Sequence, residues 1–335
     1  MIESITPPKA EKVAKSPGRS KPFLQLDQQV ELLRSRGLTI SNDQYAKDVL
    51  EDSNYYRFSG YSLTLRRNDH FFAGVTFENI DAIYNFDQTL RSLLFQYLQI
   101  IEVRFKSVYA YEFAKIYGPT SYTDPANFKS RITDHEPITA QELEDLLKKP
   151  QKMREKRLND ELFLKHYQGV DLLPIWIFIE LFTFGDLSRI FEASRDELRI
   201  AVSKHFLKNK PLRKNYRSPK NVSYMEWNLR CLTTLRNFCA HGSRLFNRVF
   251  YRKPHLTAQE LKLLINDDNT QSKLHGYKHG SPDNSHLYGL IIVMKSLLRD
   301  NNFEALKNSI VELEGKYPTV DMGYYGFPKG WESAV

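Results

Sequence analysis

Residues 75–117 read VTFENIDAIYNFDQTLRSLLFQYLQIIEVRFKSVYAYEFAKIY and contain neither glycine nor proline. Apolar side chains recur along this stretch at steps of three and four, at Leu90, Leu94, Tyr97, Ile101, Phe105 and Val108. Because an α-helix turns once every ~3.6 residues, this spacing puts them on one continuous face. The sequence therefore predicts a helix that spans the domain or breaks once, and Gly118-Pro119 ends it.

Further helical patterns lie on both sides of residues 75–117. Asp27 can cap a helix that Gly37 ends. Thr139 and Thr257 each open a capping box, in which a hydroxyl and a carboxylate satisfy exposed amides at a helix start. Additional helices are expected over residues 42–51, 175–184, 285–299 and 302–314. Because strand-like alternation is nearly absent, the predicted fold class is all-α.

Two shorter stretches carry turn signals. Residues 54–61, NYYRFSGY, have no clean period and predict a tightly packed turn, followed by a short hairpin through Asn68-Asp69. Pro174 suits the first turn of the helix expected over residues 175–184, and Asp186 can start the next helix. Neither stretch changes the all-α assignment.

The chain has 335 residues, with 48 Lys and Arg against 40 Asp and Glu, a net charge of +8 and a pI of about 9.2. Its 41% apolar and 26% charged residues are ordinary globular values, which exclude a fibrous repeat or a wholly disordered chain. The longest apolar run, residues 172–184, is far shorter than the ~20 residues of a membrane span. Residues 1–10 lack a signal-peptide pattern. We therefore expect a soluble cytoplasmic protein with no membrane partner.

The cysteine and histidine patterns predict neither a disulfide nor a metal site. Cys231 and Cys239 are expected on one helix about 12 Å apart, too far for a bond between them, and free thiols fit a reducing cytoplasm. His275 and His279 are four residues apart and His286 follows, but this segment has the composition of a loop. The phosphate-binding and zinc-protease motifs are also absent from the sequence, so we expect no cofactor and no metal.

Composition divides the chain into three regions. Residues 1–22 are rich in proline and basic residues and predict a flexible tail, either a solvated lead-in or a basic arm that touches a polyanion. Residues 23–250 hold most of the helical pattern and are expected to form the main domain. Residues 251–335 are expected to form a C-terminal helical extension packed on it.

A basic stretch, residues 204–220, has seven Lys and Arg residues, no acid, and interleaved aromatic side chains. Such a run is either a solvated face or a surface that contacts RNA phosphates. Its position directly before the helix described next favours RNA contact. The candidate RNA-binding residues are Lys204, Lys208, Lys210, Arg213, Lys214 and Arg217.

The helix with the most informative polar pattern is expected to begin at Ser223, which opens a third capping box. Its polar stripe consists of Arg230, Thr233, Asn237 and His241. Arg236 instead continues an apolar row, so its guanidinium needs an acidic partner, a subunit boundary or a phosphate. Gly242 is suited to end the helix in a left-handed conformation.

An arginine and a histidine at one helix end can cleave RNA without a metal. A neutral imidazole can take a proton from a ribose 2′-hydroxyl, and a fixed cation beside it stabilises the charge that grows on the attacked phosphate. Arg236 and His241 are separated by about 140° around an ideal helix, so Arg236 must reach round or the last turn must loosen. The R-x4-H spacing by itself also fits a capping histidine beside a surface arginine.

Residues 236–248, RNFCAHGSRLFNR, resemble the R-N-x-x-A-H-x-S-R-L-[WF]-N-R signature of the Abi-like abortive-infection family, of the AbiD and AbiF type. Residues 54–61 resemble its N-Y-Y-R-[LF]-S-G-Y block, and residues 174–188 resemble its P-[IV]-W…F-G-x-[LT]-S block. Residues 21–38 look like the family's opening, and residues 86–102 look like its long helix. These blocks occur in the family's order.

The resemblance implies a HEPN-like helical bundle, whose R-x4-6-H motif forms a metal-independent endoribonuclease site. Arg236, Asn237 and His241 then match the motif as catalytic residues, and Arg244 and Arg248 are candidate RNA contacts. Two such motifs commonly meet across a dimer, so the resemblance implies a homodimer. Some members look like toxins restrained by a small RNA antitoxin, which implies an anti-phage role for RNA cleavage.

Two other functions stay open at this point. The same fold could bind a structured RNA or a phage component without cutting it, with the motif helix as a phosphate clamp. Asn237 and His241 could instead form a polar pair in a dimer interface. RNA cleavage without magnesium that is lost on His241→Ala would separate these alternatives from a nuclease.

Overall fold

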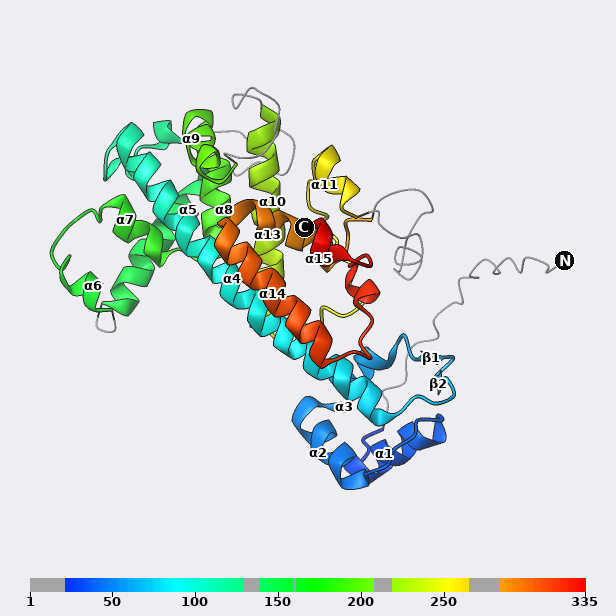
Figure 1. The fold of residues 1–335 in the computed structure, drawn as a ribbon. Coiled ribbons are helices and arrows are strands. Elements are labelled where there is room, and N and C mark those ends of the chain that lie inside the picture. The colour runs from blue at the N-terminus through cyan, green and yellow to red at the C-terminus, as the bar shows by residue number, and fades with distance from the viewer. Residues whose placement is uncertain (1–21, 129–138, 159–160, 208–218, 265–282) are drawn as a thin grey trace. The chain divides into compact units, whose positions relative to one another are not determined.

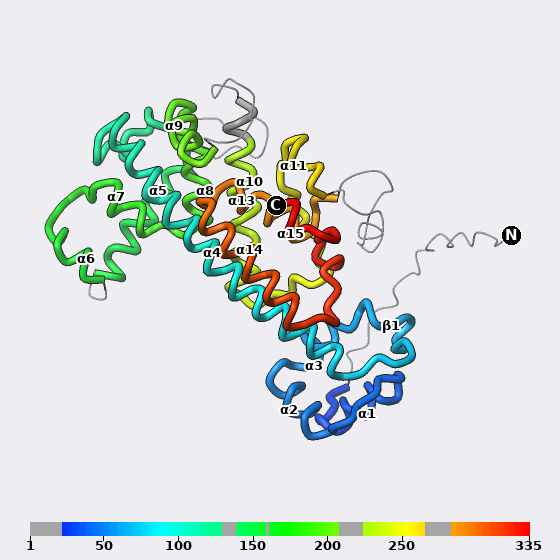
Figure 2. The backbone as a smooth tube through the Cα atoms, viewed as in Figure 1, coloured from blue at the N-terminus to red at the C-terminus, as the bar shows by residue number. Residues whose placement is uncertain are grey.

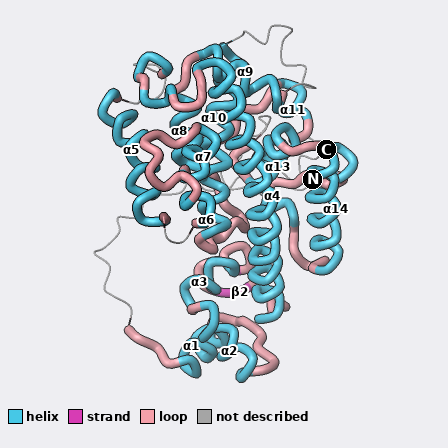
Figure 3. Tube along the Cα trace, turned by 90° about the vertical axis from the view of Figure 1, so that its left-hand side faces the viewer, coloured by secondary structure: helices cyan, strands magenta, loops and turns pink. Residues whose placement is uncertain are grey.

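The computed structural model describes residues 22–128, 139–158, 161–207, 219–264 and 283–335 (Figure 1). This part of the chain is almost entirely helical, which confirms the all-α prediction (Figure 3). Its only strands are the two-residue antiparallel pair β1 (Arg66–Arg67) and β2 (His70–Phe71). The chain divides into two compact units, Met1–Phe77 and Glu78–Val335.

The described part of the first unit contains the α-helices α1 (Leu26–Ser35), α2 (Asp43–Ser53) and α3 (Tyr55–Ser59). The predicted cap at Asp27 is wrong, because α1 begins one residue earlier and the Gln25 amide donates to the Gln28 side chain at 2.9 Å. Asp27 lies in the first turn, where its charge suits the helix dipole.

The segment predicted as a packed turn after α2 is instead the short helix α3. Asn54 adopts a φ of 66° and its side chain accepts the Tyr56 amide at 2.9 Å, which allows a new helix to begin at once. The hairpin prediction is confirmed. Asn68 and Asp69 both have positive φ, as a two-residue hairpin turn requires.

Helix α4 (Phe77–Tyr117) has 41 residues and runs without a break, which confirms the prediction from residues 75–117. The side chains at 90, 94, 97, 101 and 105 are all buried, and Gly118 follows the helix with a φ of 99°. Several charged residues are also buried along α4: Asp81, Asp87, Arg91, Glu102, Lys106 and Glu112. An ordinary apolar helix face carries no such charges. Several of them contact the candidate site described below.

Helices α5 to α15 of the second unit follow α4 along the chain. They are α5 (Ala140–Arg157), α6 (Leu162–Lys165), α7 (Ile175–Phe178), α8 (Phe184–Ala193), α9 (Asp196–Phe206), α10 (Pro219–Ala240), α11 (Ala258–Lys262), α13 (Leu287–Leu297), α14 (Asp300–Lys316) and α15 (Trp331–Ala334). The capping boxes predicted at Thr139 and Thr257 are confirmed at the starts of α5 and α11. The helices predicted over residues 285–299 and 302–314 are confirmed as α13 and α14, with ends shifted by two residues.

Two predicted helix boundaries in this unit are wrong. The helix expected over residues 175–184 breaks into α7 and a 3-10 turn, and Thr183 then caps α8 with Asp186 as its capping-box partner. Helix α10 begins at Pro219 rather than at Ser223, because proline lacks the amide that a first helical position leaves unpaired.

Helix α10 lies inside the second unit and packs against α8, α9 and α13, while α5 covers α8. The chain leaves α13 and returns as α14, which runs alongside α4 (Figure 2). The Phe86 ring of α4 contacts Tyr317 and Tyr325, so residues near the C-terminus pack on the first half of α4. Among all the described residues, no helix combines the length and the hydropathy that a membrane span requires.

Candidate active site

The candidate motif lies at the C-terminal end of α10. The Ser243 amide donates to the Phe238 carbonyl at 2.9 Å, and Gly242 has a φ of 64°, which together form a left-handed helix stop. The His241 amide still bonds the Asn237 carbonyl at 3.0 Å, so His241 belongs to the last turn. The predicted stop at Gly242 is confirmed, and the His241 side chain is exposed where it ends α10.

The side chains of α10 separate into a buried and an accessible face. Leu229, Leu232 and Leu235 are fully buried, whereas Asn237 and His241 are exposed. Arg236 lies at the border, with 28% of its side chain accessible. The helix therefore presents Asn237 and His241 to solvent and holds Arg236 partly inside the protein.

Arg236 has the acidic partner that its position on an apolar row requires. Its Nε lies 3.9 Å from Oε2 of Glu102 on α4, and its Nη1 donates to Oδ1 of Asn237 at 3.4 Å. The guanidinium also lies 5.8 Å from the centre of the Phe95 ring. These long contacts orient the guanidinium loosely, and a phosphate that approaches the exposed end of α10 would compete for it.

Glu102 belongs to a row of alternating charges. Lys106, one turn further along α4, lies 3.5 Å from Glu102 and 3.6 Å from the carboxylate of Glu180. Both α4 side chains are about nine-tenths buried. Lys106 and Arg236 share the single negative charge of Glu102. The electrostatic attraction between Glu102 and Arg236 is therefore weaker than in an isolated pair.

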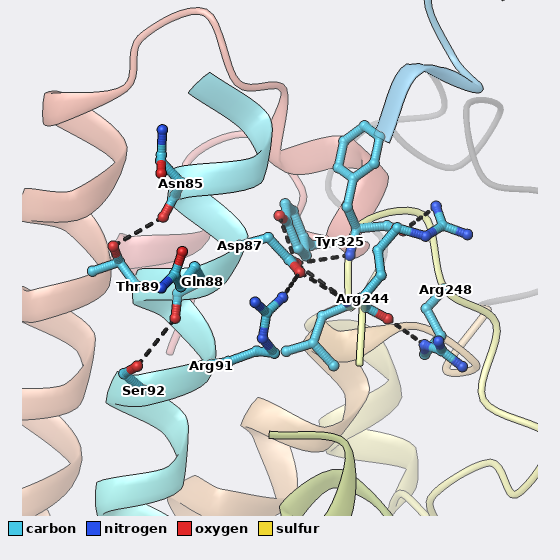
Figure 4. Close-up of polar contacts among 11 residues, drawn as sticks. Asn85, Asp87, Gln88, Thr89, Arg91, Ser92, Arg244, Arg248 and Tyr325 are labelled. Carbon is cyan, nitrogen blue, oxygen red and sulfur yellow. Dashed lines mark hydrogen bonds and ion pairs between the residues drawn. The ribbon is translucent and has the colours of Figure 1, made fainter. Parts of the chain in front are cut away.

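A second buried charge on α4, Asp87, holds the loop that follows the motif. Its carboxylate accepts the backbone amides of Leu245 and Phe246 at 2.9–3.2 Å and pairs with Arg91 one turn away (Figure 4). It also accepts the Tyr325 hydroxyl at 3.0 Å. Asp87 is completely buried, so the start of this loop is fixed to α4 by a charged acceptor with several donors.

Arg244 and Arg248 both have contacts within their own loop. Arg244 donates to the Phe246 carbonyl at 2.8 Å, and Nε of Arg248 donates to the Arg244 carbonyl. The Arg248 guanidinium lies over the Phe238 ring at 4.4 Å, next to the end of α10. Within the described residues, Arg244 has no carboxylate within 4.0 Å. The two arginines thus close the loop and bring positive charge to the motif end of α10.

Most residues of the predicted basic surface lie outside the described part of the chain. Lys204 is exposed on α9, where a contact with RNA is sterically open. The other five candidates of this stretch, Lys208, Lys210, Arg213, Lys214 and Arg217, lie outside the described residues. Their contact with RNA stays a prediction.

Neither cysteine offers a nucleophile. Burial raises the pKa of Cys231 and of Cys239 to about 12, so both thiols are protonated at neutral pH. Cys239 is two residues from His241 but on the buried face of α10, as expected from the sequence. Acyl or phosphoryl transfer through either thiol is therefore disfavoured.

Replacing Cys239 by serine tests this assignment. We expect a loss of about 1–3 kcal/mol in unfolding free energy, because serine buries a hydroxyl, while cleavage per folded molecule stays unchanged. Urea unfolding and a cleavage assay on the same preparation measure both effects. Loss of cleavage with unchanged stability would instead assign the thiol to the chemistry.

The described residues that could ligate a metal do not form a cluster. Among the residues with described positions, no three His, Cys, Asp or Glu side chains are grouped to hold a metal ion. His286 is buried beside Asp283, with Nδ1 3.5 Å from that carboxylate. His275 and His279 lie outside the described residues.

A family model described as Abi-like protein matches residues 48–247, more than half of the chain. The chain belongs to the Abi-like protein family. In this Abi-like protein, the match includes α4 and α10, and it ends at Asn247, inside the loop held by Asp87. No curated protein and no solved structure matches the chain.

The match stops short of groups that complete the site in this Abi-like protein. Tyr325, which donates to Asp87, lies well beyond the matched residues. The Asn247 amide donates to the Tyr324 carbonyl at 3.0 Å, and the Phe246 ring contacts both tyrosines. The C-terminal residues therefore contact both the motif loop and α4.

Sequence reasoning identified the motif residues but missed their partners on α4. The missed residues are Asp87, Arg91, Glu102 and Lys106. Each pair is an acid followed four residues later by a base, within a helix that carries a continuous apolar row. That spacing was the available signal, since such a pair within a buried helix face must serve a tertiary contact.

Proposed function

We propose that this Abi-like protein is a metal-independent endoribonuclease of the HEPN type. The observation that carries the proposal is that the last two turns of α10 hold both an exposed histidine, His241, and a partly accessible arginine, Arg236, whose contacts are long. Family membership suggests a role in abortive infection, and we propose that cleavage of RNA in the cytoplasm is the toxic act, restrained by a small RNA antitoxin.

In the proposed reaction, His241 takes the proton of a ribose 2′-hydroxyl, and the 2′-oxygen attacks the adjacent phosphorus. The bond from phosphorus to the 5′-oxygen breaks, and that oxygen takes up a proton from solvent or from the imidazolium. Arg236 offsets the negative charge that builds up on the phosphate oxygens, and Asn237 holds its guanidinium. The products are a 2′,3′-cyclic phosphate and a 5′-hydroxyl.

The proposal is tested by incubating the pure protein with total RNA in EDTA, followed by mapping of the new ends. We expect cleavage in EDTA and 5′-hydroxyl ends that a kinase can label directly. Binding of RNA without any cleavage would favour the alternative function, in which the α10 end is a phosphate clamp that does not cut.

We expect the active form to be a homodimer. Each chain supplies one R-x4-H motif, and in a two-fold dimer two α10 ends can face one RNA strand. Light scattering at micromolar concentration should give twice the mass of 39.3 kDa for the chain. A monomer with full cleavage activity would contradict this expectation.

The basic stretch is expected to supply affinity without selecting the sequence. Replacing Lys208, Lys210, Arg213 and Lys214 by alanine should weaken RNA binding, because fewer counterions are released. The slope of log affinity against log salt should fall by up to ~3, at ~0.7 per lost phosphate contact. An unchanged slope, measured by fluorescence anisotropy over a salt series, would show that this stretch is only a solvated face.

A further inference from the structure

A pocket in the second unit is lined by none of the residues at the C-terminal end of α10. Its volume is about 730 Å³, and its walls come from α4, α9, α11, α13 and the start of α14. That volume lies within the range of small-molecule sites, about 300–1,000 Å³. No residue of the R-x4-H motif lines it, so its role does not depend on the proposed nuclease activity.

Three cationic side chains line this pocket: Arg104, Lys295 and Arg299. Among the described residues, none of them has a carboxylate within 4.0 Å. Lys295 and Arg299 are exposed on either side of the extended link between α13 and α14, and Nζ of Lys295 lies 5.8 Å from the centre of the Phe303 ring. The charges of Arg104 and Arg299 repel each other, and an anion bound in the pocket would relieve that repulsion.

Arg104 forms a fixed part of the same wall. Its guanidinium donates to the carbonyls of Leu297 and His205 at 2.7 and 2.9 Å, and it stacks on the Phe206 ring at 4.4 Å. The pKa of Arg104 is lowered from its ordinary value, first by burial and then by the charge of Arg299. The guanidinium groups of Arg104 and Arg299 therefore repel each other electrostatically.

The carboxylates of the pocket do not neutralise these cations. Glu260 is buried and accepts hydrogen bonds from the Tyr224 and Ser296 hydroxyls and from the Thr257 amide, all at 2.8–3.0 Å. Asp300 lies in the first turn of α14, where the helix dipole stabilises its negative charge. Glu260 already accepts three hydrogen bonds, and Asp300 lies at the start of α14. Neither carboxylate pairs with the cations that line the pocket, so these cations stay available to a ligand.

Apolar side chains supply the rest of the pocket. Phe206, Leu263, Ile292 and Leu298 line it together with Ala334, near the end of α15. We propose that this pocket binds a phosphate-bearing ligand of nucleotide size, with the phosphate at Lys295 and Arg299 and the nucleoside against the apolar wall. The ligand is either a free nucleotide or the terminal nucleotide of an RNA strand.

The first test is calorimetric titration of the full chain with adenosine 5′-monophosphate, inorganic phosphate and adenosine. We expect the monophosphate to bind at least ~10-fold more tightly than adenosine, because charged hydrogen bonds to its phosphate are added. Equal affinity for the two, or no binding of the monophosphate at millimolar concentration, would overturn the proposal.

Two sets of variants locate the site. The double variant Lys295→Ala, Arg299→Ala should lose at least ~10-fold in affinity for the monophosphate, whereas Lys316→Ala at the other end of α14 should not. Ala334→Phe keeps every charge but fills the pocket, and it should weaken binding as well. Unchanged binding in Ala334→Phe would place the phosphate on the open surface and contradict a pocket.

The source of the phosphate is identified with RNA oligomers of one sequence. The titration uses a His241→Ala background so that the RNA is not cut. Tighter binding of the 5′-phosphorylated oligomer than of its 5′-hydroxyl form, lost in the Lys295/Arg299 double variant, assigns the pocket to an RNA end. Equal binding of both oligomers, together with binding of the free monophosphate, assigns it to a free nucleotide.

Discussion

Replacing Arg236 or His241 by alanine is expected to lower RNA cleavage by at least ~100-fold, with the fold intact. His241 is exposed at the end of α10 and supports no packing, while Arg236 makes only long contacts to Glu102 and Asn237. Neither change should therefore disturb the core. Cleavage rates under single-turnover conditions in EDTA measure the effect, and circular dichroism confirms the helices.

His166→Ala is the matched control for this experiment. His166 is exposed, follows α6 and lies far along the chain from the motif, so its loss should leave cleavage unchanged. New RNA ends that carry 5′-phosphates would refute the proposed chemistry, since attack by the 2′-oxygen always leaves a 5′-hydroxyl. Activity abolished by EDTA would refute it as well, and would leave the family and the fold as the remaining conclusions.

Asp87→Ala is expected to produce the largest loss of stability. The substitution removes the acceptor of two loop amides and of the Tyr325 hydroxyl, and it leaves the Arg91 guanidinium buried without this partner. Breaking a buried ion pair in this way costs about 3–5 kcal/mol. Urea unfolding followed by far-ultraviolet circular dichroism gives the change in unfolding free energy.

Tyr325→Phe provides the matched comparison, because it removes a single donor to Asp87 and keeps the ring. Its expected cost is about 1–2 kcal/mol. If Asp87→Ala were no more destabilising than Tyr325→Phe, the carboxylate would not be the main anchor of the loop after α10. Because Asp87 lies outside the R-x4-H motif, the two pairs of variants separate effects on stability from effects on the proposed chemistry.

Local patterns in the sequence predicted the elements with strong periodicity. Helix α4 was predicted because an apolar row persists over many turns without glycine or proline, and its helical state does not depend on distant residues. The hairpin at Asn68-Asp69 and the stop at Gly242 were predicted for a similar reason, since each depends on backbone conformations that few residues adopt.

The wrong boundaries arise where two local signals compete. Ser223 matches a capping box, but Pro219 begins α10 a turn earlier, so the box lies inside the helix. The run from Pro174 to Phe184 is apolar except for Glu180 and Thr183, and it gives no periodic cue to its break. The Thr183 and Asp186 pair was the available signal for the start of α8.

The candidate site was predictable only in part for a different reason. An arginine on an apolar row needs a partner, and the sequence indicates that need, but Glu102 precedes Arg236 by 134 residues. Which acid reaches it depends on how α4 and α10 pack, which no local pattern contains. The same holds for Asp87, which accepts from Leu245 and Phe246 and from Tyr325, two distant parts of the chain, besides its neighbour Arg91.

The bond between Tyr325 and Asp87 sets an order of events during synthesis. Tyr325 leaves the ribosome 78 residues after Asn247, the last residue of the family match. At ~5–20 residues per second, the R-x4-H motif is complete in sequence roughly 4–16 s before the hydroxyl that finishes the anchor of its loop is made. A nascent chain thus carries Arg236 and His241 with their loop only partly fastened, and the loop gains this anchor only after Tyr325 has been made.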